Sequence, residues 1–241
     1  MSPDSRATCD CCPLPSLCGD HGPTGLPAAL LDSVLGQRPL GAGETLYMAG
    51  EKRDSIWVVS DGALKTCELD LEGSEQVLGF HGPGEVLGLE RLEVAAHRGF
   101  AVALEPSRLC RVPVSRLVDR LTSMPELWRD VLAIAGMQIA RAREMHRVMS
   151  QLQTGQRLAW FLLNDSGPQR SGGGCGRAEV LHLPMQRQEI ASYLGMTLET
   201  VSRSFSIFQR EGLVEVRGRR ITLLNRSGLA ALAVPQERNA A

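Results

Sequence analysis

The sequence predicts an α+β protein in which an antiparallel β-roll is followed by a long helix and then by a winged helix–turn–helix. Three patterns support this prediction: short apolar segments separated by glycine turns over residues 39–114, an apolar repeat of three- and four-residue steps over 127–152, and two helical patterns that meet at Gly195. With 241 residues the chain is long enough for two modest domains. Its 43% hydrophobic and 22% charged residues are typical of an ordinary soluble protein rather than of a disordered or fibrous one.

Charge and polarity narrow the class of protein further. The net charge is −1, yet residues 185–226 hold seven arginines, four glutamates and no aspartate or lysine, so this segment is positive. No apolar run approaches the ~18 residues of a membrane span, and the polar N-terminus lacks the apolar core of a secretory signal. We therefore expect a cytoplasmic protein without a membrane partner. Its seven cysteines are then expected to be metal ligands or free thiols rather than disulfides.

The N-terminal segment, residues 1–25, is expected to bind a metal. Four cysteines lie within residues 9–18, and three of them have C-x2-C-x5-C spacing (Cys9, Cys12 and Cys18). Prolines in this stretch exclude a helix, and thiolates that converge from a loop suit zinc or an iron–sulfur cluster. A site of four thiolates needs one more ligand, from Cys11 or from a distant cysteine. We prefer a distant one because adjacent Cys11 and Cys12 are poorly placed to bind one metal; clustered free thiols are the alternative.

Residues 26–114 are predicted to form the β-roll, after a short helix at 28–35. Strands of about 4–8 residues alternate with turns at Asp61-Gly62, Glu72-Gly73 and Pro83-Gly84, a spacing that suits a small antiparallel roll. Cys67 and Cys110 both fall on its strands. Spacing alone does not choose between them as the fourth ligand.

Residues 115–153 are predicted to form a dimerisation helix whose main part begins near Pro125. Its apolar stripe extends for about seven turns, so it needs a partner along its whole length, and the same helix of a second subunit is the expected one. The residues expected in this interface are Val131, Ile134, Ala135, Ile139, Ala142, Met145 and Met149. The alanines bury little area, so we expect a marginally stable dimer. A helix packed only within its own subunit is the alternative.

Residues 154–241 are predicted to form the helix–turn–helix domain. A helix at 153–165 is followed by a glycine-rich loop, GPQRSGGGCG, and by the strand EVLHLP. Ile190, Ala191 and Leu194 then form the inner stripe of the first helix of the motif, and Gly195 ends that helix with a left-handed turn. Thr197 is the expected N-cap of the second helix. The polar side chains expected to face outward from this helix are Glu199, Ser202, Arg203 and Ser206.

The segment LVEVRGRRITLL is predicted to form a hairpin that turns at Arg217-Gly218-Arg219. Arginines beside a recognition helix are well placed to contact DNA phosphates, which makes the motif a winged helix–turn–helix. A solvated turn is the alternative. The DNA contacts expected from this domain are Glu199, Ser202, Arg203, Thr197, Thr200, Arg217 and Arg219, with Arg220 also near the hairpin tip.

This arrangement resembles the CRP/FNR superfamily of bacterial transcription regulators, and its oxygen-sensing FNR branch in particular. The resemblance covers residues 9–232 and is carried by the spaced cysteines, by EQVLGFHGPGEVLG and by LGMTLETVSRSFSIFQREGL. It implies a cupin-like, cyclic-nucleotide-binding-like roll. It also implies an oxygen-labile [4Fe–4S] cluster held by Cys9, Cys12, Cys18 and Cys110, whose presence favours a homodimer that binds DNA.

The resemblance further implies that Glu199, Ser202 and Arg203 read palindromic half-sites of TTGAT character. Glutamate accepts a hydrogen bond from cytosine, and arginine donates two to guanine. RNA polymerase is the implied second partner, contacted through surface loops of the roll to activate genes for growth without oxygen. Arg98-Gly99-Phe100 lacks the serine of the nucleotide-binding branch, so we expect no functional cyclic-nucleotide pocket.

Two other functions are alternatives to this one. A regulator that senses nitric oxide through haem, or a small ligand through the roll, would keep the DNA-binding half and leave the clustered cysteines with another metal or none. An iron–sulfur enzyme lacks support, because the chain has neither a nucleotide fingerprint nor clustered catalytic carboxylates.

Overall fold

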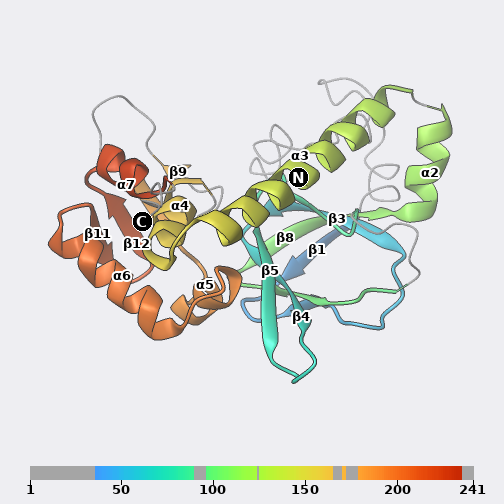
Figure 1. Ribbon diagram of the computed structural model, residues 1–241. Coiled ribbons are helices and arrows are strands. Elements are labelled where there is room, and N and C mark those ends of the chain that lie inside the picture. Colours follow the sequence, from blue (N-terminus) through green and yellow to red (C-terminus); the bar gives the residue numbers. More distant parts are fainter. Residues whose placement is uncertain (1–35, 90–95, 124, 165–169, 172–178, 235–241) are drawn as a thin grey trace. The chain divides into compact units, whose positions relative to one another are not determined.

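The computed structural model describes residues 36–89, 96–123, 125–164, 170–171 and 179–234 (Figure 1). The N-terminal cysteines and the helix expected at 28–35 lie outside these residues. Contacts within the chain define two units, one of residues up to 141 without 75–77, and one of 142–241 with 75–77.

The first unit contains the β-roll, built from two four-stranded sheets with the strand orders β1-β8-β3-β6 and β2-β7-β4-β5. The strands are β1 (Gly36–Leu40), β2 (Thr45–Tyr47), β3 (Ser55–Asp61), β4 (Leu64–Leu69), β5 (Glu75–His81), β6 (Val86–Leu87), β7 (Phe100–Ala103) and β8 (Ser107–Pro113). Turns form where glycines were expected to supply them, since Gly62, Gly73 and Gly84 all have positive φ. One apolar core of the roll combines side chains from both sheets, among them Trp57, Leu64 and Leu109.

Two helices follow the roll. Helix α2 (Val114–Ser123) and helix α3 (Pro125–Gln151) contribute Leu117, Leu127 and other apolar side chains to a second core on β3, β6 and β8. Polar contacts continue this attachment along α3, because Gln138 donates a hydrogen bond to the carbonyl of Val86 at 3.1 Å. Arg141 donates to Glu85 at 3.0 Å and 3.2 Å and to the carbonyl of Phe80 at 3.1 Å.

This packing involves two residues of the predicted dimer interface. Val131 and Ile134 are only 9% and 4% exposed, because both belong to the core that α3 shares with its own roll. Both side chains therefore pack within their own unit. The remaining residues of that set are partly or fully exposed.

The second unit contains helix α4 (Thr154–Asn164), a four-stranded sheet of order β11-β12-β10-β9, and three further helices. Their bounds are α5 (Arg187–Tyr193), α6 (Leu198–Arg210), α7 (Arg226–Leu232), β9 (Arg170–Ser171), β10 (Glu179–His182), β11 (Val214–Arg217) and β12 (Arg220–Leu223). The α+β fold class is as predicted. One difference is β9, which pairs with β10 inside the stretch expected to be only a loop. No helix among the described residues is both long and apolar enough to span a membrane.

Candidate nucleic-acid interface and sensor residues

Local hydrogen bonds fix the helix starts and the turn in the helix–turn–helix of α5 and α6. The side chain of Glu189 accepts from the N–H of Gln186 at 2.5 Å at the start of α5. Gly195 has φ +58° after the last turn of α5, and the next N–H, of Met196, donates to the carbonyl of Ala191 at 2.9 Å. Thr197 then caps α6 by accepting from the N–H of Thr200 at 3.2 Å. The predicted turn at Gly195 and the predicted cap at Thr197 are both confirmed.

The inner faces of the two helices pack as their apolar spacing predicts. Ile190, Ala191 and Leu194 of α5 are buried, and so are Val201, Phe205 and Phe208 of α6. Small Ala191 lies at the position where two crossing helices need a short side chain. This packing leaves the opposite face of α6 for contact with another molecule.

That outer face carries polar groups of both charges. Glu199, Arg203 and Ser206 are exposed and Ser202 is half-buried. Hydrogen bonds from its own backbone N–H and from the Thr197 hydroxyl hold the pKa of Glu199 below its ordinary value, so the side chain is an acceptor at neutral pH. Arg203 makes no ion pair within the described part of the chain, so its donors are available to a ligand.

The hairpin of β11 and β12 forms the predicted wing. Arg217 pairs with Arg220 across the ladder, and Gly218 has φ +62° in the turn between them. Arg217, Arg219 and Arg220 are all exposed, although Arg217 forms an ion pair with Glu215 at 2.6 Å. Arg219 and Arg220 are therefore the better candidates for phosphate contacts.

Arg157, a residue that sequence reasoning did not single out, ties three segments of the second unit together. From α4 its guanidinium donates to the carbonyl of Met149 in α3 at 2.9 Å and to that of Leu152 at 3.0 Å. A third bond, of 3.1 Å, reaches the carbonyl of Leu194, the C-cap of α5. The side chain thus satisfies carbonyls that helix ends leave without partners, and it holds the end of α3 against the turn of the helix–turn–helix.

Helix α3 also presents an exposed apolar stripe that the sequence analysis only partly identified. Trp128, Leu132 and Ile139 are 49%, 64% and 55% exposed. The spacing continues along the helix in alternating steps of four and three residues, through Trp128, Leu132, Ala135, Ile139, Ala142, His146 and Met149. His146 is polar, and Ala135 and Met149 are half-buried. Steps of this kind are typical of a helix that packs along a partner helix. The heptad spacing was the signal that could have revealed Trp128 and Leu132.

Of the four expected metal ligands, only Cys110 lies among the described residues. Cys110 is half-buried on β8 and packs against the core shared with α2 and α3. Cys67, the other candidate, is 1% exposed, so a metal held by another segment would reach its thiol less readily. Within the described ranges, no three His, Cys, Asp or Glu side chains gather in a way that could hold a metal ion.

The segment at Gly99 bears on nucleotide binding. A Cβ atom at this position would lie 2.1 Å from the carbonyl oxygen of Cys67 and 2.9 Å from a side-chain carbon of Glu68. Because the first of these is a backbone atom, β4 would have to shift before a serine could occupy the site. The close approach of Gly99 to β4 therefore requires glycine at this position.

Comparison with known proteins covers both halves of the chain. Residues 156–232 match the model of the Crp-like helix-turn-helix domain, and residues 37–123 match that of the cyclic nucleotide-binding domain. The chain is 36% identical to the transcriptional activator protein FnrA of Stutzerimonas stutzeri over 95% of its own length and 93% of that protein. It is 34% identical to the fumarate and nitrate reduction regulatory protein of Salmonella typhi, over 84% and 81%. The solved structure of FixK2 from Bradyrhizobium japonicum superimposes with a TM-score of 0.75 at 29% identity, covering 84% of this chain and 99% of that one.

Proposed function

The chain belongs to the CRP/FNR family of DNA-binding transcription regulators, and on that premise we propose that it is an oxygen-responsive regulator of anaerobic metabolism. In this proposal the active form is a homodimer that carries a [4Fe–4S] cluster and binds palindromic half-sites of TTGAT character. The family is one of transcription factors and not of enzymes.

The outer face of α6 is the observation that carries the DNA-reading part of the proposal. Ionised Glu199 is an acceptor suited to the N4 amino group of cytosine, and Arg203 has donors for the O6 and N7 atoms of guanine. Ser202 lies between them and serves a base edge or a phosphate. Thr197 and Thr200 at the start of the helix, with Arg217, Arg219 and Arg220 in the wing, are proposed to contact phosphates.

The dimer is proposed to form along the exposed stripe of α3, with half-buried Met145 beside it. In place of Val131 and Ile134, which pack on their own roll, the stripe contributes Trp128 and Leu132 to the interface. Ala135 and Ala142 keep that interface small, so its stability is expected to depend on a further contribution. A two-fold dimer matches the two-fold symmetry of a palindromic site.

That further contribution is proposed to come from the cluster. Its ligands would be Cys9, Cys12 and Cys18 from the N-terminal segment and Cys110 from β8, a set of four thiolates suited to a [4Fe–4S] centre. The half-buried position of Cys110, beside the core shared with α2 and α3, supports this assignment. When bound, the cluster would supply a reaction with oxygen. Its four ligands would cross-link the N-terminal segment to β8, and loss of the cluster would leave Cys110 and the neighbouring helices without that cross-link.

A regulator of this kind also needs RNA polymerase as a partner, and we propose contact through surface loops of the roll. The cyclic-nucleotide pocket of the fold is proposed to have lost its ligand, a view supported by the lack of room for a serine at Gly99.

Purification without oxygen tests the cluster assignment. The full chain should be brown and contain four iron and four acid-labile sulfide per subunit; air should bleach it and shift it from dimer to monomer on a sizing column. Cys110→Ser should abolish the iron content, whereas Cys67→Ser, its matched control within the roll, should retain it. A colourless protein with stoichiometric zinc, or equal iron in both variants, would contradict the assignment.

A further inference from the structure

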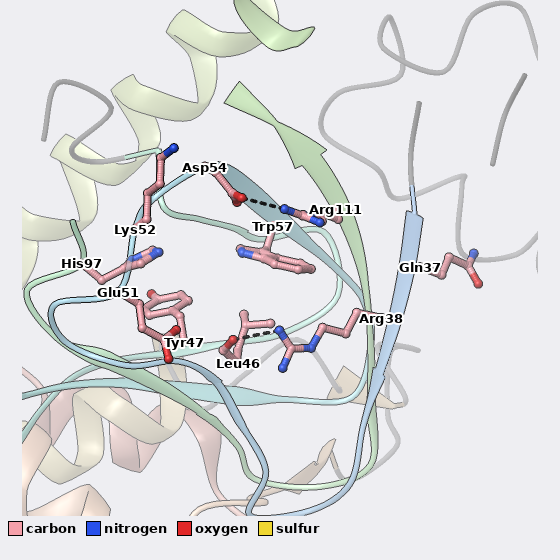
Figure 2. Close-up of a pocket in the computed structure, with 10 residues that line it drawn as sticks. All are labelled: Gln37, Arg38, Leu46, Tyr47, Glu51, Lys52, Asp54, Trp57, His97 and Arg111. Carbon is pink, nitrogen blue, oxygen red and sulfur yellow. Dashed lines mark hydrogen bonds and ion pairs between the residues drawn. The ribbon is translucent and has the colours of Figure 1, made fainter. Parts of the chain in front are cut away.

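The β-roll contains a cavity of about 430 Å³ whose chemistry the proposed function does not use (Figure 2). Its volume lies within the range of about 300–1,000 Å³ that is usual for small-molecule sites. The cavity is lined by residues of β1, β2, β3 and β8 and of the segments around residues 51–54 and 97. All of these belong to the first unit.

Strand register explains why two arginines line this cavity, which is open to solvent. Trp57 of β3 pairs with Arg111 of β8, and Val59 pairs with Leu109, which in turn pairs with Arg38 of β1. Residues paired across a ladder share a face of the sheet, so both arginines lie on the face that carries core residues Trp57 and Leu109. Cys110 is on the opposite face, against the other core. The cavity is therefore separate from the expected cluster ligand.

Aromatic side chains form much of the wall. Trp57 is buried, and the guanidinium carbons of Arg38 and Arg111 lie 5.7 Å and 5.8 Å from the centre of its ring. Tyr47 and His97, also buried, stack with their ring centres 3.7 Å apart. Figure 2 shows this stacked pair on one side and Trp57 with the arginines on the other. Surfaces of this kind can stack against a planar ring.

The backbone holds these walls in place. The N–H of Gly50 donates to the carbonyl of His97 at 2.8 Å, and the N–H of His97 donates to the carbonyl of Glu51 at 3.0 Å. A β-bridge joins Lys52 to Ala96 on the same two segments. The site is thus pre-organised, which lowers the entropy cost of binding.

Three cationic side chains (Arg38, Lys52 and Arg111) and two carboxylates (Glu51 and Asp54) line the cavity, so its charges favour an anion. The Glu51 carboxylate accepts a hydrogen bond from the N–H of Met48 at 3.2 Å. Arg111 is paired with Asp54 at 2.8 Å. Within the described residues, Arg38 donates only to the backbone carbonyls of Leu46 and Thr45, at 3.0 Å and 3.4 Å, and has no carboxylate partner. The Lys52 side chain forms no hydrogen bond or ion pair there, although its charge interacts with that of Asp54. A guanidinium has five N–H donors, so Arg38 keeps donors for a ligand. Its planar fork matches a carboxylate, as it also matches a phosphate.

We propose that this cavity binds a small aromatic carboxylate, with its ring between the Tyr47–His97 pair and Trp57 and its carboxylate on Arg38 and Lys52. An inward arginine on an edge strand such as β1 also protects the edge from unwanted pairing. That role does not account for the second arginine, since β8 is paired on both sides. Nor does it account for the open space beside the two side chains.

Titration calorimetry on the full chain tests the proposal with three probes: benzoate, its uncharged analogue benzamide, and acetate, which lacks the ring. Benzoate should bind saturably with one site per subunit, and the other two at least ten-fold more weakly. Arg38→Gln should weaken benzoate binding at least ten-fold. The control is Arg108→Gln, which removes an exposed arginine of the adjacent strand β8 that is paired with Asp61, and it should leave binding unchanged.

Lys52→Met provides a second variant in case Arg38→Gln lowers the melting temperature, because Lys52 is exposed. It should weaken benzoate binding several-fold without unfolding the roll. The proposal is overturned if benzoate shows no saturable binding, if benzamide binds as tightly as benzoate, or if neither variant changes the affinity. None of these outcomes depends on the cluster or on DNA binding.

Discussion

The contacts of Arg157 lead to a prediction about how the DNA-binding unit is held together. Arg157→Met keeps most of the apolar stem and removes all the donors to Met149, Leu152 and Leu194. A hydrogen bond to a charged group contributes about 1.5–3 kcal/mol, so three of them set an upper bound of about 4.5–9 kcal/mol. Arg157 is only half-buried, and water will replace part of the loss. We expect the free energy of unfolding of the second unit to fall by about 2–4 kcal/mol.

Urea denaturation followed by circular dichroism measures this loss, and hydrogen exchange shows where it occurs. Amides of α5 and of the last turn of α3 should exchange faster, whereas those of the β-roll should not. Arg143→Met is the matched control, since Arg143 is exposed on α3 and has no hydrogen bond within the described ranges. If Arg157→Met unfolds within about 0.5 kcal/mol of the parent and the control, the three carbonyl contacts do not hold the unit together.

Three further predictions concern DNA reading, the dimer and pH. Arg203→Ala should cost about 1–3 kcal/mol of DNA binding and relax specificity at one base pair; equal weakening on every sequence, measured by fluorescence anisotropy, would instead make Arg203 a phosphate contact. Ile139→Glu should give a monomer in anaerobic sedimentation, whereas Met137→Glu, equally exposed on α3 but outside the stripe, should remain dimeric. Burial raises the pKa of Glu85, but its hydrogen bonds and charge interactions with His81 and Arg141 outweigh this and leave the pKa below its ordinary 4.5. The ionised carboxylate therefore stabilises the fold above about pH 4.5, and this contribution is lost as the pH falls through the lower folded value. Glu85→Gln should accordingly be destabilising in urea at pH 7, with a difference that shrinks below pH 4.5; a constant difference would refute the role of the charge.

Features encoded by neighbouring residues could be predicted from the sequence. The turn at Gly195 and the cap at Thr197 depend on a glycine with positive φ and on a hydroxyl at the start of a helix. The glycine turns of the roll are of the same kind. The polar face of α6 followed directly from helical spacing, because its apolar residues could only face α5.

Features that depend on contacts distant in sequence could not. Helix α3 has apolar residues on two sides, and periodicity does not say which side packs on the roll. The predicted interface therefore includes Val131 and Ile134, which lie in the core of their own unit, and omits the exposed Trp128 and Leu132. The cavity at Arg38 requires the register of β1, β8 and β3, which no local pattern reveals.

We propose that the state of the cluster controls DNA binding. The decisive measurement of this claim is the fluorescence anisotropy of a labelled duplex with a palindromic TTGAT site, titrated with the anaerobically purified chain before and after exposure to air. We predict tight, sequence-specific binding before exposure and at least a ten-fold loss after it, with Cys110→Ser weak under both conditions. Equal affinity before and after exposure, with Cys110→Ser indistinguishable from the parent, would contradict the claim and leave a DNA-binding protein whose signal is not oxygen.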